Sequence, residues 1–302
     1  MPDAAVDAMA WVEGGTFRMG SDDHYPEEAP ARPVAVDGFW IDRCPTTNAE
    51  FARFVEASGY LTVAERPLDA DAFPGAPEEN LVPGSLVFTM TPGPVDLRHL
   101  SQWWTWTPGA CWRRPDGPGS TIAGREDEPV VHIAYEDAEA YAQWAGKALP
   151  SEAEWELAAR GGLDGATYVW GDAPEAPGER LANYWHGDFP WRADAGYGVR
   201  SAVGAFAPNG YGLHDMAGNV WEWTSDWYVE RRGDGAGPAC CMPAAEDSYD
   251  PAQPQFRIPR KVVKGGSYLC ADSYCLRYRP AARRPQMIDT GMSHIGFRCV
   301  SR

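Results

Sequence analysis

Glycine and proline interrupt this chain so often that few of its segments have room for regular secondary structure. The 302 residues include 32 Gly and 27 Pro, and these residue types favour turns and end helices. Apolar residues nevertheless recur at helical spacing in three places. We predict helices from Thr46–Thr47 to Gly59, from Glu136 to Ala145, and from the Ser151–Glu154 capping box to Gly161.

The remaining regular structure is predicted to be short strands. Alternating apolar residues indicate strands at 11–20, around a Gly-Gly turn, and at 34–41, 168–170, 220–224, 261–264 and 296–300. Residues 60–128 show no periodicity and are rich in Pro, Gly and Trp, which predicts long irregular surface structure. Because no repeat and no clean domain boundary is visible, we predict one α+β domain over residues 1–302, with few helices, short strands and much irregular loop.

The charge of the chain excludes one class of partner. With 43 Asp and Glu against 26 Lys and Arg, the formal net charge is −17, whereas nucleic-acid binding needs a basic surface. Residues 1–10 lack the features of a signal peptide, and no apolar run approaches membrane-spanning length. Seven cysteines is an odd number, which suits a reducing compartment better than a disulfide framework. We therefore expect a monomeric cytoplasmic protein that binds neither nucleic acid nor membrane.

A pair of cysteines near the C-terminus is the strongest candidate for chemistry. Cys270 and Cys275 lie in the stretch KGGSYLCADSYCLRYRPAARR, from Lys264 to Arg284, and four arginines follow them. Nearby cations lower the pKa of a thiol, and a thiolate is both a nucleophile and a soft metal ligand. The pair also fits a structural disulfide or two buried small side chains. A four-ligand zinc site is not predicted, because no second Cys or His pair is near.

The string GGSYLCADSYCLRYR resembles the active-site segment of the formylglycine-generating enzymes of bacterial type, also called sulfatase-modifying factors. Other segments match this family in the same order: WVEGGTFRMGSDD, EAPARPVAVDGFWID, TNAEFARFVEASGYLTVAE, WAGKALPSEAEWELAARGG, NGYGLHDMAGNVWEWTSDW and GFRCV. The resemblance covers nearly the whole chain and implies a fold similar to that of C-type lectins. The earlier segments occur in relatives that share only the fold, so only the cysteine segment bears on activity.

The resemblance implies an oxidase that holds Cu(I) on Cys270 and Cys275. Family members use O2 to oxidise a Cys in a Cys-x-Pro-x-Arg motif of an extended sulfatase chain to Cα-formylglycine, with the substrate thiolate as a further copper ligand. Cu(I) is soft and accepts two thiolates, and the six His residues are too scattered for a local two-His metal motif. The resemblance places Ser267 and Tyr274 beside the reacting oxygen and Trp103 in the substrate groove. The alternative for Ser267 is a hydroxyl that stabilises a turn, and the alternative for Tyr274 is an aromatic ring packed in the core. The alternative for Trp103 is an ordinary core or surface aromatic residue.

Two oxygen-rich segments are predicted to bind calcium. In DMAGNVWE, residues 215–222, two carboxylates and an amide lie close together, which suits Ca²⁺ but is not an EF-hand pattern. An Asx-rich turn that enters a strand is the alternative. The resemblance implies ligands here at Asp215, Gly218, Val220 and Glu222, with Gly218 and Val220 using their carbonyls. It implies a second set at Asn183, Tyr184, Asp194 and Tyr197, where the loop is shorter than in the family and Asp194 is chosen for its carboxylate.

The disulfides of vertebrate family members are not expected here. The positions that match their cysteines include Ala142, Ala159, Pro280 and Cys299, so neither bridge can form. Cys240 and Cys241 are neighbours in a predicted loop insertion, where a bridge would be strained, and they have no assigned role.

Two other functions are weighed against this one. A non-catalytic paralogue that binds sulfatases would share the fold, but such relatives lack the cysteine pair. An iron-dependent sulfoxide synthase also shares the fold, but it carries an extra helical domain with a His-based iron site, and this chain has neither the length nor the His spacing. The substrate arginine is expected to meet a carboxylate, for which Asp69 is the candidate, since Pro45 stands at a family glutamate position.

Overall fold

The computed structural model describes residues 8–68, 81–176, 178–230 and 243–302. Asp69, Cys240 and Cys241 lie outside this part of the chain. Its α-helices are α2 (Asn48–Ser58), α3 (Tyr135–Trp144) and α4 (Glu152–Arg160). Its short 3₁₀ helices are η1 (Pro26–Glu28), η2 (Val63–Glu65), η4 (Leu100–Gln102) and η5 (Ala245–Ser248). Across the described ranges, no helix combines the length and the apolar character needed to cross a lipid bilayer.

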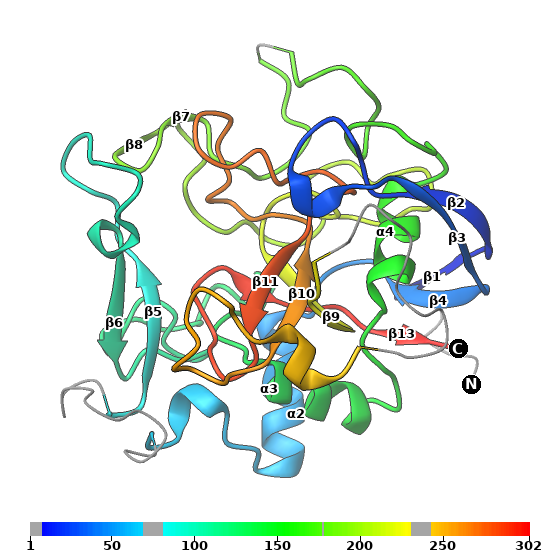
Figure 1. Ribbon diagram of the computed structural model, residues 1–302. Helices are drawn as coiled ribbons and strands as arrows, with labels where there is room; N and C mark the ends of the chain where they lie inside the picture. Colours follow the sequence, from blue (N-terminus) through cyan, green and yellow to red (C-terminus); the bar gives the residue numbers. More distant parts are fainter. Residues whose placement is uncertain (1–7, 69–80, 177, 231–242) are drawn as a thin grey trace.

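The described strands form five small sheets (Figure 1). The largest has the order β11-β10-β9-β12, with strands Arg284–Met287, Arg260–Lys264, Trp221–Trp227 and Ile295–Gly296, and it lies near the centre of the molecule. In the second sheet, β4 (Phe39–Asp42) lies between β1 (Met9–Val12) and β13 (Val300–Ser301), so segments near both ends of the chain meet. The three remaining sheets are pairs: β2 (Gly15–Met19) with β3 (Arg32–Val36), β5 (Gly84–Phe88) with β6 (Trp104–Pro108), and β7 (Gly187–Asp188) with β8 (Arg192–Ala193).

The three predicted helices are confirmed, and two of them begin at the predicted capping residues. The Thr47 hydroxyl accepts a hydrogen bond from the Glu50 N–H at 3.2 Å, and the Ser151 hydroxyl accepts one from the Glu154 N–H at 3.1 Å. In both cases the glutamate carboxylate accepts the N–H of the capping residue in return. A glycine in the left-handed conformation ends both helices, as the sequence predicts.

The strand predictions are confirmed in part. The predicted class, α+β with few helices and short strands, is confirmed, and β3, β4, β9 and β10 fall where expected. The strand predicted at 168–170 is wrong, because only an isolated bridge joins Tyr168 to Gly171. The predicted strand 296–300 divides between β12 and β13, which join different sheets. The segment 60–128 is not wholly irregular, because β5 pairs with β6 across an intervening loop. These pairings depend on partners that no local pattern reveals.

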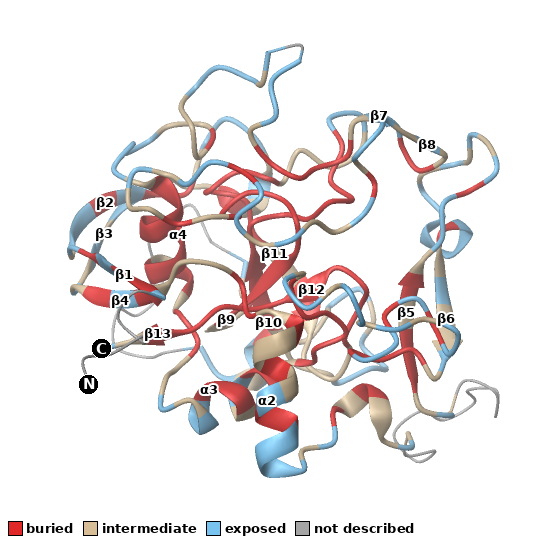
Figure 2. Ribbon diagram, turned by 180° about the vertical axis from the view of Figure 1, so that it is seen from behind, coloured by how far each residue is buried: buried red, intermediate tan, exposed pale blue. Residues whose placement is uncertain are grey.

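Buried side chains concentrate on β10 and α4, whereas many residues of the β2–β3 pair are exposed (Figure 2). Aromatic residues from α2, α3 and β9 pack in one core, with Phe51 5.9 Å from Tyr141 between ring centroids. A second core joins α4 to the N-terminal strands through Trp155. A third, smaller cluster around Trp103 and Phe189 lies beside the cysteine segment.

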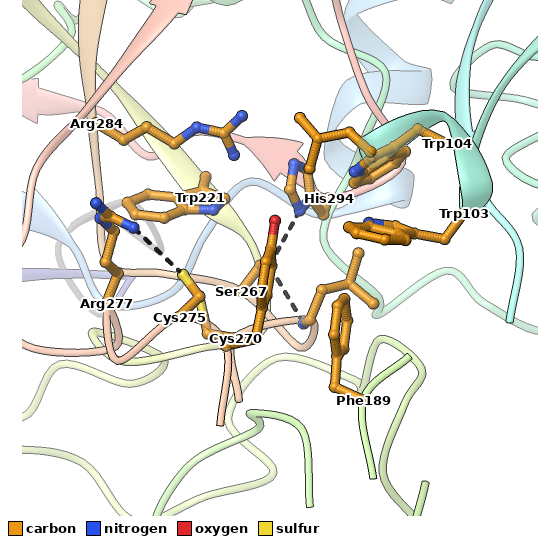
Figure 3. Close-up of a pocket in the computed structure, with 13 residues that line it drawn as sticks. Trp103, Trp104, Phe189, Trp221, Ser267, Cys270, Cys275, Arg277, Arg284 and His294 are labelled. Carbon is orange, nitrogen blue, oxygen red and sulfur yellow. Dashed lines mark hydrogen bonds between the residues drawn. The ribbon is translucent and has the colours of Figure 1, made fainter. Parts of the chain in front are cut away.

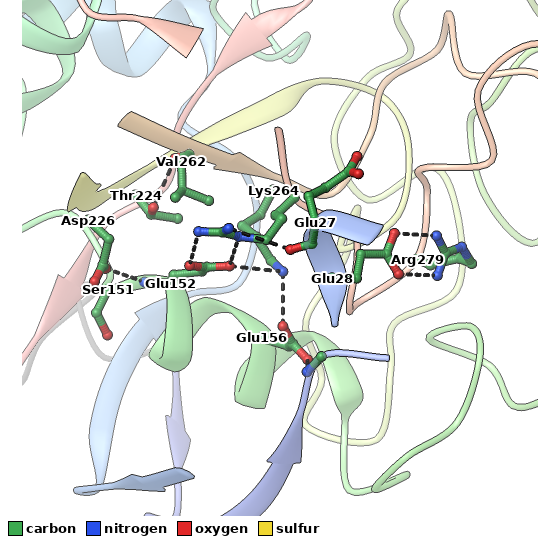
Figure 4. Close-up of polar contacts among 12 residues, drawn as sticks. Glu27, Glu28, Ser151, Glu152, Glu156, Thr224, Asp226, Val262, Lys264 and Arg279 are labelled. Atoms are coloured by element: carbon green, nitrogen blue, oxygen red, sulfur yellow. Dashed lines mark hydrogen bonds and ion pairs between the residues drawn. The ribbon is translucent and has the colours of Figure 1, made fainter. Parts of the chain in front are cut away.

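Buried ion pairs, more than long strands, join the distant segments of this fold (Figure 4). Lys264–Glu156 and Arg279–Glu28, with N–O distances of 3.0 and 2.5 Å, are labelled in Figure 4. The other pairs are Arg283–Glu152 and Arg298–Glu222, at 2.8 and 2.7 Å. All of these side chains are buried. Removing one partner of a buried pair leaves an uncompensated charge, which costs about 3–5 kcal/mol. The pairs therefore fix β10 and the segment 277–284 against α4 and η1.

Gly218 is a position where the fold has no room for a side chain. Its φ is +76°, and a Cβ there would lie 2.1 Å from the main-chain oxygen of Asn183. That oxygen accepts the Asn219 N–H at 2.7 Å, so the 183 and 218 segments are held in direct contact. Gly162 provides a matched comparison, because its φ is +88° and nothing lies within 4 Å of a Cβ built there.

We predict that Gly218→Ala lowers the free energy of unfolding by roughly 3 kcal/mol or more, because it adds a backbone clash to the left-handed strain. Gly162→Ala should cost only about 1–2 kcal/mol, the strain alone. Chemical denaturation of both variants measures the difference. Equal losses would show that the contact between the 183 and 218 segments contributes nothing.

Candidate functional site

Cys270 and Cys275 lie at a cavity of about 230 Å³ (Figure 3). Its walls come from segments far apart in the sequence. They are η4 with the start of β6, the residue that directly follows β7, the start of β9, the loop between β10 and β11, the start of β11, and the chain between β11 and β12. The lining residues are Leu100, Trp103, Trp104, Phe189, Trp221, Ser267, Leu269, Cys270, Tyr274, Cys275, Arg277, Arg284 and His294. Seven of the thirteen are aromatic or aliphatic, and the others are polar or sulfur-bearing, so the two sulfurs face a space of mixed character with two guanidinium groups beside it.

The two sulfurs are close but not bonded. Their separation is 3.3 Å, which is within reach of a sulfur hydrogen bond and well beyond the roughly 2.05 Å of a disulfide. Cys270 is buried, and burial raises the pKa of its thiol well above the usual value. The hydrogen bond from Cys270, followed by the charges of Arg277 and Arg284, lowers the pKa of Cys275. The pair is thus arranged as one thiol that donates to one thiolate.

The loop between β2 and β3 holds the cation beside Cys275. The Arg277 Nη1 lies 4.0 Å from the Cys275 sulfur, and its Nη2 donates to the Glu27 carboxylate at 2.6 Å. The Tyr25 ring lies under the same guanidinium, 3.8 Å away, and the Tyr25 hydroxyl accepts the Leu276 N–H at 3.1 Å. A segment near the N-terminus therefore sets the position of the positive charge next to the thiolate.

Two tight turns bring the cysteine segment back on itself. Gly266 has φ +73°, and a Cβ there would lie 2.9 Å from the Arg277 carbonyl oxygen. The Cys270 N–H donates to the Ser267 carbonyl at 2.9 Å, and the Cys275 N–H donates to the Ala271 carbonyl at 2.6 Å. The glycine at 266 allows the chain at Arg277 to approach closely, and the two local hydrogen bonds fold the loop that carries both sulfurs.

The structure brings the other predicted site residues to the same cavity. Ser267 is buried, with its hydroxyl 3.1 Å from His294 Nδ1. Tyr274 stacks on Phe189 at 4.7 Å between centroids, and burial raises the pKa of its phenol, so the hydroxyl stays protonated at neutral pH. Trp103 is 1% exposed and packs edge-on against both rings. Trp103 therefore belongs to the inner wall of the cavity.

Arg284 lines the cavity and is one of the four arginines that the sequence places after the cysteine pair. The sequence interpretation missed other lining residues, above all His294, Phe189 and Trp221. None of them lies within the cysteine loop, and no spacing links them to it. His294 precedes β12, whose pairing with β9 is parallel, and this pairing carries it to the cavity. Only the GFRCV segment that follows two residues later could have drawn attention to it.

The 183–197 site for calcium has one residue that fits a cation. The Asn183 side-chain oxygen is buried without a hydrogen-bond partner among the described residues, while its Nδ2 donates to Val199 O at 3.0 Å and Ser201 Oγ at 3.1 Å. A buried oxygen without a donor is the kind of ligand that Ca²⁺ accepts. Asp194 and Tyr197 belong to one turn, in which the Tyr197 N–H donates to the Asp194 carbonyl at 3.0 Å.

The 215–222 site for calcium fits less well. Both Glu222 oxygens accept hydrogen bonds from Arg298, and one of them also accepts the Trp155 indole N–H at 2.7 Å. The Asp215 carboxylate accepts the Gly204 N–H at 2.8 Å. The Glu222 charge is thus already balanced by a buried guanidinium. Among the described residues, no group of three or more His, Cys, Asp or Glu is arranged to hold a metal, so calcium would depend on amide and carbonyl oxygens.

Comparison with known proteins gives consistent matches. Residues 1–302 match the model of the sulfatase-modifying factor enzyme 1-like domain. The chain is 55% identical to the formylglycine-generating enzyme of Mycobacterium tuberculosis over 96% of both proteins. A mouse protein named inactive C-alpha-formylglycine-generating enzyme 2 is 38% identical, over 97% of this chain and 85% of its own length. The structure of PvdO from Pseudomonas aeruginosa shares the fold, with a TM-score of 0.62 at 24% identity over 97% of this chain and 93% of that chain.

We predict that Arg277→Leu raises the pKa of the reactive thiol in the metal-free protein, because it removes a positive charge beside the Cys275 sulfur. The pH dependence of alkylation by iodoacetamide, located by peptide mass spectrometry, measures this pKa. The rise of reactivity with pH should move to higher pH in the variant. Arg18→Leu, at an exposed arginine that does not line the cavity, is the control and should leave the profile unchanged. An unchanged profile for Arg277→Leu would contradict the electrostatic account.

Proposed function

The chain belongs to the sulfatase-modifying factor family, and from that premise we propose that it converts a cysteine of client sulfatases to Cα-formylglycine. The observation that carries the proposal is the pair of unbonded sulfurs, 3.3 Å apart, at a cavity large enough for a small side chain. A second candidate, a non-catalytic paralogue, is suggested by the mouse relative whose name calls it inactive. The paired cysteines favour catalysis, since a binding module has no need of a poised thiolate.

Copper is the proposed cofactor, and Cys270 and Cys275 would hold it. The donor set fits, because two soft sulfurs converge and no carboxylate of the described residues lines the same cavity. Bound Cu(I) would supply the oxidising chemistry with O2 that removes hydrogen from the substrate Cβ. In the net reaction the thiol and O2, with two hydrogens from a thiol reductant, give an aldehyde, hydrogen sulfide and water.

The residues of the cavity have separate tasks in this proposal. The rings of Trp103, Phe189 and Tyr274 exclude water from the reacting sulfur, which strengthens electrostatic interactions there. Arg277 stabilises the negative charge of the Cys275 thiolate, and Ser267 contributes a hydroxyl to the cavity that contains the two sulfurs. The substrate would be an extended chain with the motif Cys-x-Pro-x-Arg, and the net charge of −17 suits a peptide that carries arginine. The cytoplasmic location and the monomeric state stay predictions.

One assay tests the activity. Incubation of the protein with Cu(I), O2, a thiol reductant and a Cys-x-Pro-x-Arg peptide should give an aldehyde, detected by a hydrazide probe and by mass spectrometry. Cys270→Ser and Cys275→Ser should each reduce kcat/KM by roughly 10³-fold or more and abolish tight Cu(I) binding, because a hydroxyl is a hard, protonated ligand. Cys44→Ser, at a cysteine that does not line the cavity, should keep turnover and serve as the control. Full activity of Cys270→Ser or of Cys275→Ser would contradict the proposal.

Calcium is proposed to stabilise the loops without taking part in the reaction. Addition of Ca²⁺ to the chelated protein should raise the melting temperature, because a ligand that binds only the folded state stabilises it. At a hundredfold excess over Kd, the free energy of unfolding should rise by about 2.7 kcal/mol. Asn183→Ala should remove this calcium-dependent shift. Glu222→Gln should lower stability with or without calcium, because it breaks the pair with Arg298. Loss of the calcium shift in Glu222→Gln but not in Asn183→Ala would move the site to 215–222.

A further inference from the structure

The hydroxyl of Ser267 lies at the cavity with two neighbours that limit where its proton points. The Leu269 N–H donates to the Ser267 oxygen at 3.3 Å, and His294 Nδ1 lies 3.1 Å from the same oxygen. The side chains of Ser267 and His294 are buried, and both residues line the cavity. The His294 carbonyl accepts the Trp221 N–H at 2.9 Å, which fixes the main chain at this residue beside β9.

The direction of the Ser267–His294 hydrogen bond depends on which ring nitrogen carries the proton. His294 Nε2 is buried and has no hydrogen-bond partner among the described residues. Burial and the charge of Arg284 hold the pKa of His294 well below its usual value, so the ring is neutral and carries one proton. A proton on Nε2 would create a buried donor without an acceptor, which proteins rarely tolerate, whereas an unpaired acceptor is less costly. The proton therefore belongs on Nδ1.

With this tautomer, Ser267 receives two donors and must give its own proton elsewhere. The Leu269 N–H and the His294 Nδ1–H occupy the lone pairs of the oxygen. The hydroxyl is then free to turn toward the cavity that contains the two sulfurs (Figure 3). A hydroxyl directed in this way is a donor placed in advance for negative charge that develops on a reactant.

We propose that His294 is a positioning residue that, through its Nδ1–H, aims the Ser267 hydroxyl proton into the cavity above Cys270 and Cys275. The part of this inference that concerns catalysis rests on the proposed function. The part that concerns the tautomer rests on the burial and the hydrogen bonds of the described residues and is independent of the proposed function. The two parts have separate tests.

The protein contains a second buried histidine beside a serine, which serves as an internal control. His132 Nδ1 lies 2.7 Å from the Ser85 hydroxyl, and its Nε2 lies 2.7 Å from the Pro115 carbonyl oxygen. Burial lowers the pKa of His132 to about 4, so the ring is neutral, and because a carbonyl only accepts, its one proton lies on Nε2. Nδ1 is then an acceptor that competes for the Ser85 hydroxyl proton with the Gly291 carbonyl, which also lies 2.7 Å from the Ser85 oxygen. The two His–Ser pairs are thus expected to have opposite tautomers. The difference follows from one carbonyl that is present at His132 and has no counterpart at His294 Nε2.

The tautomer is measured in the wild-type protein without copper or substrate. Long-range ¹H–¹⁵N correlation spectra distinguish Nδ1–H from Nε2–H imidazoles, and the spectra of His294→Asn and His132→Asn assign the signals by their disappearance. We expect Nδ1–H for His294 and Nε2–H for His132. An Nε2–H signal from His294, with its proton on the face of Trp104 whose ring centroid is 4.7 Å away, would overturn the inference.

Turnover then tests whether the orientation matters. His294→Leu removes the donor and should lower kcat roughly tenfold with KM nearly unchanged, because the hydroxyl serves the reacting state. His294→Asn has an amide N–H that can replace Nδ1–H, and it should keep kcat within about threefold of wild type. The double variant Ser267→Ala/His294→Leu should be no slower than Ser267→Ala, because His294 acts only through Ser267.

Melting temperatures separate this role from a general loss of packing. His132→Leu removes a buried His–Ser contact outside the cavity and should lower the melting temperature while leaving kcat within about twofold. Additive losses of kcat in the double variant, or equal losses in His294→Asn and His294→Leu, would contradict the positioning role. If wild type shows the Nδ1–H tautomer but makes no aldehyde, the orientation of Ser267 stands and the proposed function fails.

Discussion

The buried pairs of carboxylates and cations are the constraint on which this structure depends. In the part of the chain that the structure describes, the strands are short and spread over five sheets, so main-chain pairing alone connects few distant segments. Arg279 reaches Glu28 and Arg283 reaches Glu152, and these two pairs fasten the chain just after the cysteines to η1 and α4. Such pairs are weak evidence for stability as a whole, but each is costly to break, so they specify one arrangement of the loops.

The same arrangement sets the electrostatics of the cysteine pair. Because η1 is fixed by Arg279, Glu27 and Tyr25 of the same loop lie where they hold Arg277 beside the Cys275 sulfur. Burial disfavours charge on Cys270 and leaves it as the hydrogen-bond donor. The fold therefore separates two chemically identical groups into a thiol and a thiolate, in a cavity whose wall includes both aromatic rings and guanidinium groups.

The sequence predicted what local rules decide. The capping boxes at Thr47 and Ser151 and the glycines that end those helices are local signals, and the helices formed as expected. The resemblance located the cysteine loop with Ser267 and Tyr274. Neither kind of reasoning found His294 or the pairing of Glu222 with Arg298, because these contacts join residues 27 and 76 positions apart. Long-range contacts of this kind leave no periodicity in the sequence.

The central claim is that the fold presents one thiol and one thiolate for a soft metal. The number of protons released when Cu(I) binds to the metal-free protein at neutral pH tests it most directly, because both ligands must be deprotonated in the complex. The account predicts about one proton per copper, from Cys270, since Cys275 has already lost its own. Release of about two protons would show that both sulfurs are ordinary thiols and would contradict the account.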